Sequence, residues 1–127
     1  MIEVSRILVS EKLENKALRH KRREGSAPVV VWCTTKRCNL NCMHCYSGGN
    51  TASDGELSTD EAKKMLDELK DCGSPFMILS GGEPFLRADV FELGRYAREI
   101  GLMVIVSSNG TTVTPEIAAK AADAGFG

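Results

Sequence analysis

Three alternating pairs of strand-like and helix-like segments predict an α/β fold, with a parallel sheet and helices outside it. The strand-like segments, residues 29–32, 76–79 and 103–106, are short apolar runs without a polar face, which is typical of strands in a parallel sheet. The segments that follow them carry apolar residues at helical spacing between helix start and stop signals. Because strand–helix–strand connections are right-handed, the helices are expected to cover the outside of the sheet.

The first strand leads into a long loop and then into a helix with clear boundaries. Residues 35–57 are rich in Cys, Asn and Gly, a composition that favours a loop. Ser58 and Glu61 have the spacing of a capping box, and Gly73 marks the end of the helix.

The second and third helices also carry their own boundary signals. The second spans about residues 88–100 and is closed by Gly101, whereas the third is capped by Thr114, opened by Pro115 and runs toward Gly125. A complete (β/α)₈ barrel needs about 250 residues, and this chain has 127. We therefore predict a partial TIM-type (β/α) barrel that contains only the first three βα units.

Two parts of the chain differ in composition. Residues 1–27 contain a strongly basic run, residues 16–24, which predicts a solvated leader or helix outside the main fold; a contact surface for an anionic partner is the alternative. Residues 28–127 form the folded domain. They stop at residues 123–127, where a fourth strand is expected to start, so we interpret the chain as a truncated product with an exposed edge strand.

The composition is that of an ordinary globular protein. Apolar residues make up 43% and charged residues 26%, and 16 basic against 17 acidic residues give a net charge of −1. This balance argues against a nucleic-acid partner bound through bulk charge. The longest apolar stretch, residues 28–33, is far shorter than the roughly 20 residues that cross a bilayer, and no secretory signal is recognisable. We expect a cytoplasmic protein with no membrane span.

Cys38, Cys42 and Cys45 form a CxxxCxxC pattern in the loop after the first strand. Three thiolates on one tight loop can converge on a single small site, and they leave one position of a four-ligand centre open. His44 offers a fourth ligand for zinc, although it would have to fold inward over two of the cysteines. A simple thiol redox centre is a further alternative. The remaining cysteines fit no ligand spacing and are expected to pack within the fold: Cys33 and Cys72.

A second motif, Ser80-Gly81-Gly82-Glu83-Pro84, follows the second strand. It lies at the carboxyl ends of the strands, where such barrels place their active sites. The two glycines allow a ligand to approach the backbone closely, and Glu83 supplies a carboxylate. A plain strand-to-helix turn is the alternative interpretation.

A third polar segment, residues 107–111 with the sequence SSNGT, follows the third strand. An Asn-Gly turn is its simplest interpretation. Its position at the same predicted edge as the other two motifs makes Ser108 and Asn109 candidate binding residues.

Together these motifs resemble the radical SAM superfamily, whose hallmark is CxxxCxxC after the first strand of a partial TIM barrel. The resemblance implies that Cys38, Cys42 and Cys45 hold a 4Fe-4S cluster. It also implies that S-adenosylmethionine binds the fourth iron through its amino and carboxylate groups.

The same resemblance implies further contacts with the cofactor. In the family the GGEP motif, here Gly81, Gly82, Glu83 and Pro84, holds the methionine ammonium group. The residue at the position of His44 usually lies near the adenine, and a tyrosine at the position of Tyr46 is common in one subgroup. Ser108 and Asn109 match the (T/S)NG segment of SPASM-related enzymes, which lies close to the cofactor pocket. No side chain is assigned a catalytic role.

The activity that the resemblance implies is one-electron reductive cleavage of S-adenosylmethionine, whose 5′-deoxyadenosyl radical abstracts hydrogen from a substrate. An electron donor such as ferredoxin or flavodoxin would be required, and residues 28–127 would be the N-terminal half of the core domain. Residues 1–50 resemble more specifically the radical SAM proteins of alternative haem and haem d biosynthesis, which alter side chains of sirohaem-derived tetrapyrroles. A peptide- or sulfatase-modifying enzyme is one alternative, and a non-catalytic iron–sulfur or zinc-binding module is another.

Overall fold

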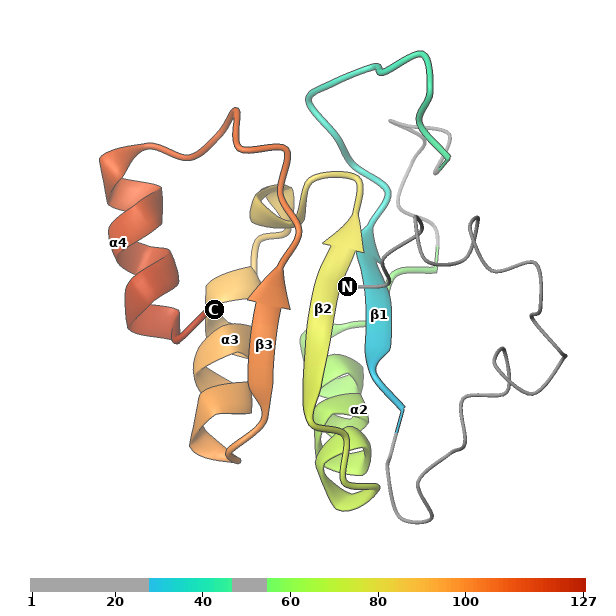
Figure 1. Ribbon diagram of the computed structural model, residues 1–127, viewed down its shortest axis with the longest axis vertical. Helices are drawn as coiled ribbons and strands as arrows, with labels where there is room; N and C mark the ends of the chain where they lie inside the picture. Colours follow the sequence, from blue (N-terminus) through green and yellow to red (C-terminus); the bar gives the residue numbers. More distant parts are fainter. Residues whose placement is uncertain (1–27, 47–54) are drawn as a thin grey trace, which may run out of the picture.

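The computed structural model describes residues 28–46 and 55–127, which form three βα units in chain order (Figure 1). The strands are β1 (Val30–Thr35), β2 (Phe76–Gly81) and β3 (Met103–Val106). The helices are α2 (Thr59–Asp71), α3 (Val90–Glu99) and α4 (Pro115–Ala124), with a short 3₁₀ helix, η1 (Pro84–Leu86), between β2 and α3. The predicted α/β class and the predicted order of elements are confirmed. The basic run predicted to form a leader or helix lies outside the described residues.

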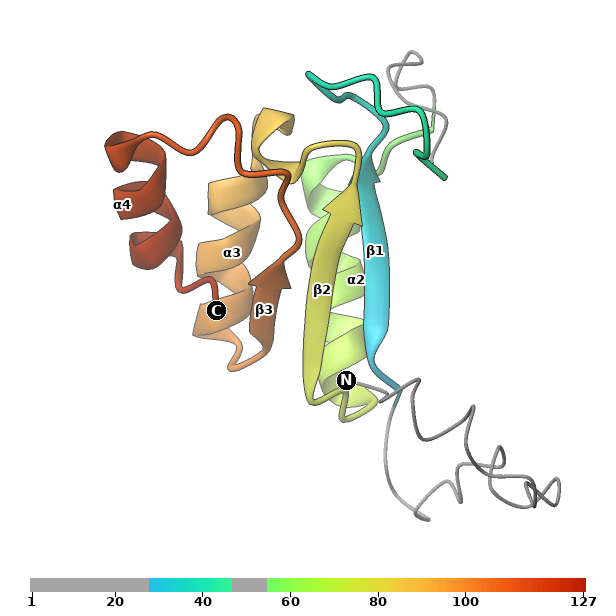
Figure 2. The ribbon, with the colours of Figure 1, turned by 45° about the horizontal axis from the view of Figure 1, so that its top comes forward.

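The three strands form one parallel sheet in the order β1-β2-β3. Helices α2 and α3 lie on the same face of this sheet, and α4 packs beside α3 (Figure 2). This arrangement is the one that right-handed crossovers predict.

The hydrophobic core lies between the sheet and the helices that cover it. The strand residues Met77, Leu79 and Val104 are at most 3% exposed. They pack against apolar residues of α2 and α3 and of the turn before β3: Ala62, Leu66, Val90, Leu93, Ala97 and Leu102.

The opposite face of the sheet is open within the part of the chain that the structure describes. The register pairs Val31 with Ile78 and Ile78 with Ile105, so an apolar row crosses all three strands on this face. Val31 is 57% exposed.

The prediction that the two remaining cysteines pack within the fold is wrong. Cys33 is exposed, because it alternates with Trp32 and Thr34 and so falls on the open face of the sheet. Cys72 is exposed at the end of α2, where its thiol donates to the Leu69 carbonyl oxygen at 3.2 Å.

The helix boundaries follow the signals in the sequence. Ser58 and Glu61 form a complete capping box at the start of α2. The Thr114 side chain accepts a hydrogen bond from the backbone of α4, and Gly125 ends that helix in the left-handed conformation. The second helix starts at Val90, two residues later than predicted, because residues 88–89 form a turn between η1 and α3.

The chain returns to the sheet after α4. Phe126 forms an isolated parallel bridge with Val104, and the Gly127 N–H donates to the Val104 carbonyl oxygen at 3.0 Å. Residues 126–127 therefore lie beside β3, in the place of the fourth strand expected from the sequence.

In the described residues, no helix has the length and apolar character needed to cross a membrane.

Candidate functional site

The three polar motifs lie at one edge of the sheet. Each motif follows the carboxyl end of a strand, and the parallel order of β1, β2 and β3 places those ends side by side (Figure 1). In barrels of this kind the functional site is built at that edge.

The cysteine motif lies in the loop that follows β1. Cys38 is half-buried, Cys42 and Cys45 are exposed, and none of the three forms a disulfide. The Cys45 N–H donates to the Cys42 carbonyl oxygen at 3.1 Å, and the Leu40 N–H donates to the Cys38 sulfur at 3.4 Å. No group of three His, Cys, Asp or Glu residues lies together as a metal site in residues 28–46 and 55–127. The fit to an iron–sulfur cluster therefore rests on the chemistry of three thiols in one loop.

The two other candidate residues of this loop are open to solvent. His44 is exposed, and Tyr46 is 81% exposed. Both are direct neighbours of Cys45 in the chain.

The two glycines of the second motif make room for the backbone that leads to the cysteines. The Gly82 N–H donates to the Thr35 carbonyl oxygen at 2.7 Å, and the Glu83 N–H donates to the Arg37 carbonyl oxygen at 2.8 Å. A Cβ on Gly81 would lie 2.5 Å from the Thr35 oxygen, and one on Gly82 would overlap the Arg37 carbonyl. The sequence suggested that a ligand approaches here, whereas the chain itself takes up this space.

Glu83 connects the second motif to the third. Its side chain is completely buried, as is the neighbouring Pro84. The carboxylate accepts hydrogen bonds from the Phe85 N–H at 3.1 Å, the Ser108 hydroxyl at 3.0 Å and the Asn109 N–H at 2.8 Å. These three donors hold the carboxylate in one orientation.

Asn109 connects the third motif to the cysteine loop. Its Nδ2 lies 3.0 Å from Asn39 Oδ1 and 3.8 Å from the Cys38 sulfur, to which it donates a long hydrogen bond. Asn39 in turn donates to the Thr111 hydroxyl at 2.7 Å. The structure therefore links all three predicted motifs through hydrogen bonds.

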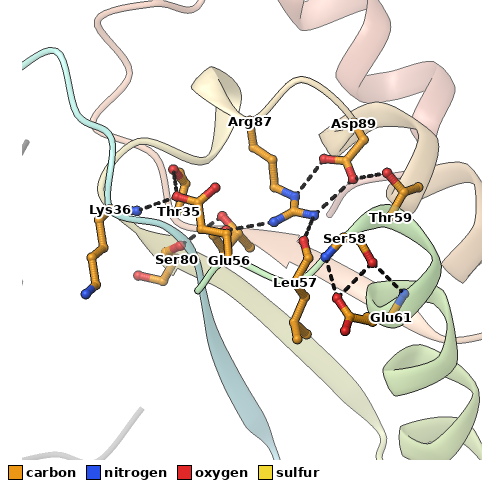
Figure 3. Close-up of polar contacts among 11 residues, drawn as sticks. Thr35, Lys36, Glu56, Leu57, Ser58, Thr59, Glu61, Ser80, Arg87 and Asp89 are labelled. Atoms are coloured by element: carbon orange, nitrogen blue, oxygen red, sulfur yellow. Dashed lines mark hydrogen bonds and ion pairs between the residues drawn. The ribbon is translucent and has the colours of Figure 1, made fainter. Parts of the chain in front are cut away.

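Sequence reasoning missed a set of polar and charged side chains around the start of the cysteine loop and the end of η1 (Figure 3). Arg87, three residues after Pro84, is 7% exposed and donates to two backbone carbonyl oxygens. Asp89 forms an ion pair with it, with Oδ1 2.6 Å from Nε. Glu56 accepts hydrogen bonds at the start of the cysteine loop. The local signal for this set was the pair of opposite charges at Arg87 and Asp89, two positions apart before a helix. Such pairs are common in sequences, so the pattern did not single these residues out.

Burial and hydrogen bonding act in opposite directions on the Asp89 carboxyl. Burial raises the pKa of Asp89, but hydrogen bonds from Arg87 and Thr59 and the charge of Arg87 outweigh it. The pKa therefore lies below its ordinary value of 3.8, and the group is ionised at neutral pH.

Comparison with known families identifies the chain. The family model of the Radical SAM superfamily matches residues 32–127, which include all three motifs. The chain belongs to the radical SAM superfamily. Membership implies that the family's cofactors, S-adenosylmethionine and a 4Fe-4S cluster, are the ones to be tested at this edge.

Several radical SAM relatives with established names are similar in sequence. An AdoMet-dependent heme synthase of Methanosarcina barkeri is 52% identical over 99 residues, covering 76% of this chain and 28% of the relative. An Fe-coproporphyrin III synthase of the same organism is 44% identical and covers 92% of this chain and 29% of the relative. A mycofactocin maturase MftC of Mycolicibacterium smegmatis is 41% identical, and the match covers 76% of this chain and 25% of the relative. The chain thus spans less than a third of the length of these relatives.

Solved structures share the fold at low sequence identity. BtrN, in complex with AdoMet and 2-DOIA, matches 80% of this chain and 44% of its own with a TM-score of 0.68 and 18% identity. SuiB of Streptococcus suis, bound to the precursor peptide SuiA, matches 74% of this chain and 21% of its own, with a TM-score of 0.63 and 20% identity. These likenesses confirm the fold.

Proposed function

We propose that this chain provides the cluster- and cofactor-binding part of a radical SAM enzyme that modifies a tetrapyrrole. The observation that carries the proposal is the 52% identity to an AdoMet-dependent heme synthase across 76% of the chain. Residues 28–127 would be the N-terminal part of the core domain. The identity to an Fe-coproporphyrin III synthase, over 92% of the chain, supports the same substrate class.

In this proposal Cys38, Cys42 and Cys45 would hold the 4Fe-4S cluster. When bound together with S-adenosylmethionine, the cluster supplies the one-electron reductive cleavage of that cofactor. The exposure of Cys42 and Cys45 leaves the loop accessible to an electron donor such as ferredoxin or flavodoxin.

The residues after β2 and β3 would bind and orient the cofactor. Three donors already make four contacts with the Glu83 carboxylate, which is completely buried. The Ser108 hydroxyl contacts both carboxylate oxygens, and in this proposal it would release one of them to the methionine ammonium group. Ser108 and Asn109, held by that carboxylate, would line the same pocket. The remaining proposed contacts come from Gly81, Gly82 and Pro84 beside Glu83, and from His44 and Tyr46 in the cysteine loop.

A peptide substrate is the second candidate. It is favoured by the 41% identity to a mycofactocin maturase and by the fold shared with SuiB, which was solved with a precursor peptide. These observations are weaker, because the first is a lower identity and the second concerns the fold alone.

The test begins with anaerobic reconstitution of the protein, followed by iron and sulfide analysis. Four irons and four sulfides, lost in the Cys38→Ala, Cys42→Ala, Cys45→Ala triple variant, are the expected result; stoichiometric zinc would support the zinc-module alternative instead. The reduced protein is then incubated with S-adenosylmethionine and either an iron porphyrin that bears propionates or a precursor peptide. Formation of 5′-deoxyadenosine together with consumption of the porphyrin supports the proposal. Formation of 5′-deoxyadenosine together with modification of the peptide, and of the peptide alone, contradicts it.

A further inference from the structure

The two ends of the segment that carries the cysteines are held against each other (Figure 3). At its start, the Thr35 hydroxyl donates to Glu56 Oε1 at 2.6 Å, and the Lys36 N–H donates to the same oxygen at 3.1 Å. Glu56 lies at the other end of this segment, just before α2. A single carboxylate therefore joins residues that are 21 positions apart in the chain.

Arg87 makes a second connection between the same two ends. One guanidinium nitrogen donates to the Thr34 carbonyl oxygen at 2.9 Å, and another donates to the Leu57 carbonyl oxygen at 2.7 Å. The planar guanidinium presents its donors in a fixed fork, which lets one side chain serve two carbonyl groups. Arg87 follows η1, which begins at Pro84 of the GGEP motif, so it ties the cysteine segment to the second motif.

The Arg87 side chain is itself held by Asp89 and by the Trp32 ring. Asp89 Oδ2 accepts hydrogen bonds from Arg87 at 3.0 Å and from the Thr59 hydroxyl at 2.7 Å, and Asp89 Oδ1 lies 2.6 Å from Arg87 Nε in the ion pair. The guanidinium carbon lies 5.1 Å from the centre of the Trp32 ring. A buried cation needs such partners, because removing it from water is costly.

We propose that Arg87, Asp89 and Glu56 form a clasp that positions the cysteine segment for cluster binding. The inference rests on the proposed assignment of Cys38, Cys42 and Cys45 to a 4Fe-4S cluster. Bringing three thiolates of one segment to a single site loses conformational entropy. A segment whose ends are already fixed loses less, so the clasp favours cluster binding and slows cluster loss. Arg87 acts through the segment and is a positioning residue.

The experiment compares Arg87→Lys, Glu56→Ala and Glu56→Gln with a control, Arg98→Lys. Lysine keeps the positive charge of Arg87 but loses the fork that reaches both carbonyl groups. Glutamine at position 56 keeps an oxygen acceptor, whereas alanine removes it. Arg98 is an exposed arginine of α3 that donates to the backbone carbonyl oxygen of Asp123. Arg98→Lys is therefore the same substitution as Arg87→Lys, made at an arginine outside the clasp.

Two measurements are made on each variant. Amide hydrogen exchange is followed in the cluster-free protein for residues 38–46 and for α3, and iron loss to a chelator is followed in the reconstituted protein. Arg87→Lys and Glu56→Ala should accelerate exchange in residues 38–46 and iron loss by about tenfold, the scale of outer-shell effects on metal sites. Exchange in α3 should stay unchanged, and Glu56→Gln and Arg98→Lys should behave like the unsubstituted protein.

Specific outcomes overturn the clasp. Unchanged exchange in residues 38–46 for both Arg87→Lys and Glu56→Ala contradicts it, and so does faster exchange in α3 to the same degree, which would show a general role in folding. If Arg87→Lys fails to fold, Glu56→Ala at the half-exposed position decides. An unsubstituted protein that binds no iron contradicts the proposed function. In that case amide exchange in the cluster-free protein still tests whether the clasp holds residues 38–46.

Discussion

Gly82 shows how one residue without a side chain links two strands. Its N–H donates to the Thr35 carbonyl oxygen, and the Arg37 carbonyl occupies the space where a Cβ would stand. The neighbour is backbone, which cannot move aside by changing a rotamer. A side chain here would therefore push away the start of the cysteine segment.

We expect Gly82→Ala to lower both iron content and affinity for S-adenosylmethionine, with destabilisation of about 1–3 kcal/mol from overpacking. Iron analysis, cofactor titration and urea unfolding measure the three effects. Gly110→Ala is the control: it has a positive φ of 75° but no atom near its Cβ position, so it carries backbone strain without a clash. Retention of full iron content in Gly82→Ala would contradict this account of the glycine.

Glu83 is the second residue whose substitution separates two roles. Glu83→Ala leaves the N–H groups of Phe85 and Asn109 and the Ser108 hydroxyl without their acceptor, which is expected to destabilise the fold by about 2–3 kcal/mol. If the carboxylate also binds the ammonium group, affinity for S-adenosylmethionine falls at least tenfold while iron content is retained. Calorimetric titration of the reconstituted variant checks this. Loss of stability with unchanged cofactor affinity would leave Glu83 a purely structural role.

At the scale of elements, the loop after β3 reaches the cysteine loop through Asn109. The Nδ2 of Asn109 lies 3.8 Å from the Cys38 sulfur, and hydrogen bonds to sulfur stabilise the reduced state of a cluster. We expect Asn109→Ala to lower the midpoint potential of the cluster by about 20–60 mV, the equivalent of one hydrogen bond.

A redox titration followed by electron paramagnetic resonance measures that potential. Thr111→Val serves as the control, because it removes the hydroxyl contacts to Asn39 and Asn109 but leaves the donor to the Cys38 sulfur in place. Equal shifts in the two variants would show that loop position, not the hydrogen bond to sulfur, sets the potential.

The connection between η1 and α3 depends on the charge of Asp89. Because its pKa is lowered in the folded state, the Arg87–Asp89 pair contributes stability above the ordinary value of 3.8, and this contribution is lost as the pH falls through the folded pKa. Asp89→Asn should reduce the free energy of unfolding by about 1.5–3 kcal/mol at neutral pH. The difference should shrink below about pH 4.

Urea unfolding of both proteins across this acid range measures the difference. Glu116→Gln provides a comparison, since hydrogen bonding to Lys120 lowers the pKa of Glu116 at the surface, where an ion pair contributes little. A difference between Asp89→Asn and the unsubstituted protein that stays constant with pH would contradict the assignment.

At the scale of the whole molecule, the open face of the sheet is the dominant surface feature. The row of Val31, Ile78 and Ile105 is joined by Met103, which is 58% exposed at the start of β3. Exposed apolar strands at a sheet edge favour pairing with a further strand or chain. The 127-residue chain on its own is therefore expected to self-associate.

Sedimentation velocity over a range of concentrations tests this expectation. Lysine at both Val31 and Met103 should shift the chain toward the monomer, since both side chains lie on the open face and both are more than half exposed. Val113→Lys, at an exposed position after β3 and outside the sheet, is the matched control and should leave association unchanged. A monomeric unsubstituted chain at high concentration would contradict the prediction.

Local signals were sufficient to predict the strands, the α-helices and the motif positions, but not the short helix η1. The capping box of Ser58 and Glu61, the cap at Thr114 and the left-handed Gly125 each act within one helical turn, so neighbouring residues contain the information. The apolar strands and the alternation of elements fixed the parallel order, and parallel order alone places the three motifs at one edge.

The tertiary structure alone decided which residues support those motifs and which face of the sheet stays open. Arg87 finds the Thr34 carbonyl 53 positions away, and Glu83 finds Ser108 and Asn109 at 25 and 26 positions. No local pattern specifies such partners, because they depend on how the strands pack and not on neighbouring residues. The exposure of Val31 has the same cause: an apolar residue in a strand is buried only where another layer covers it.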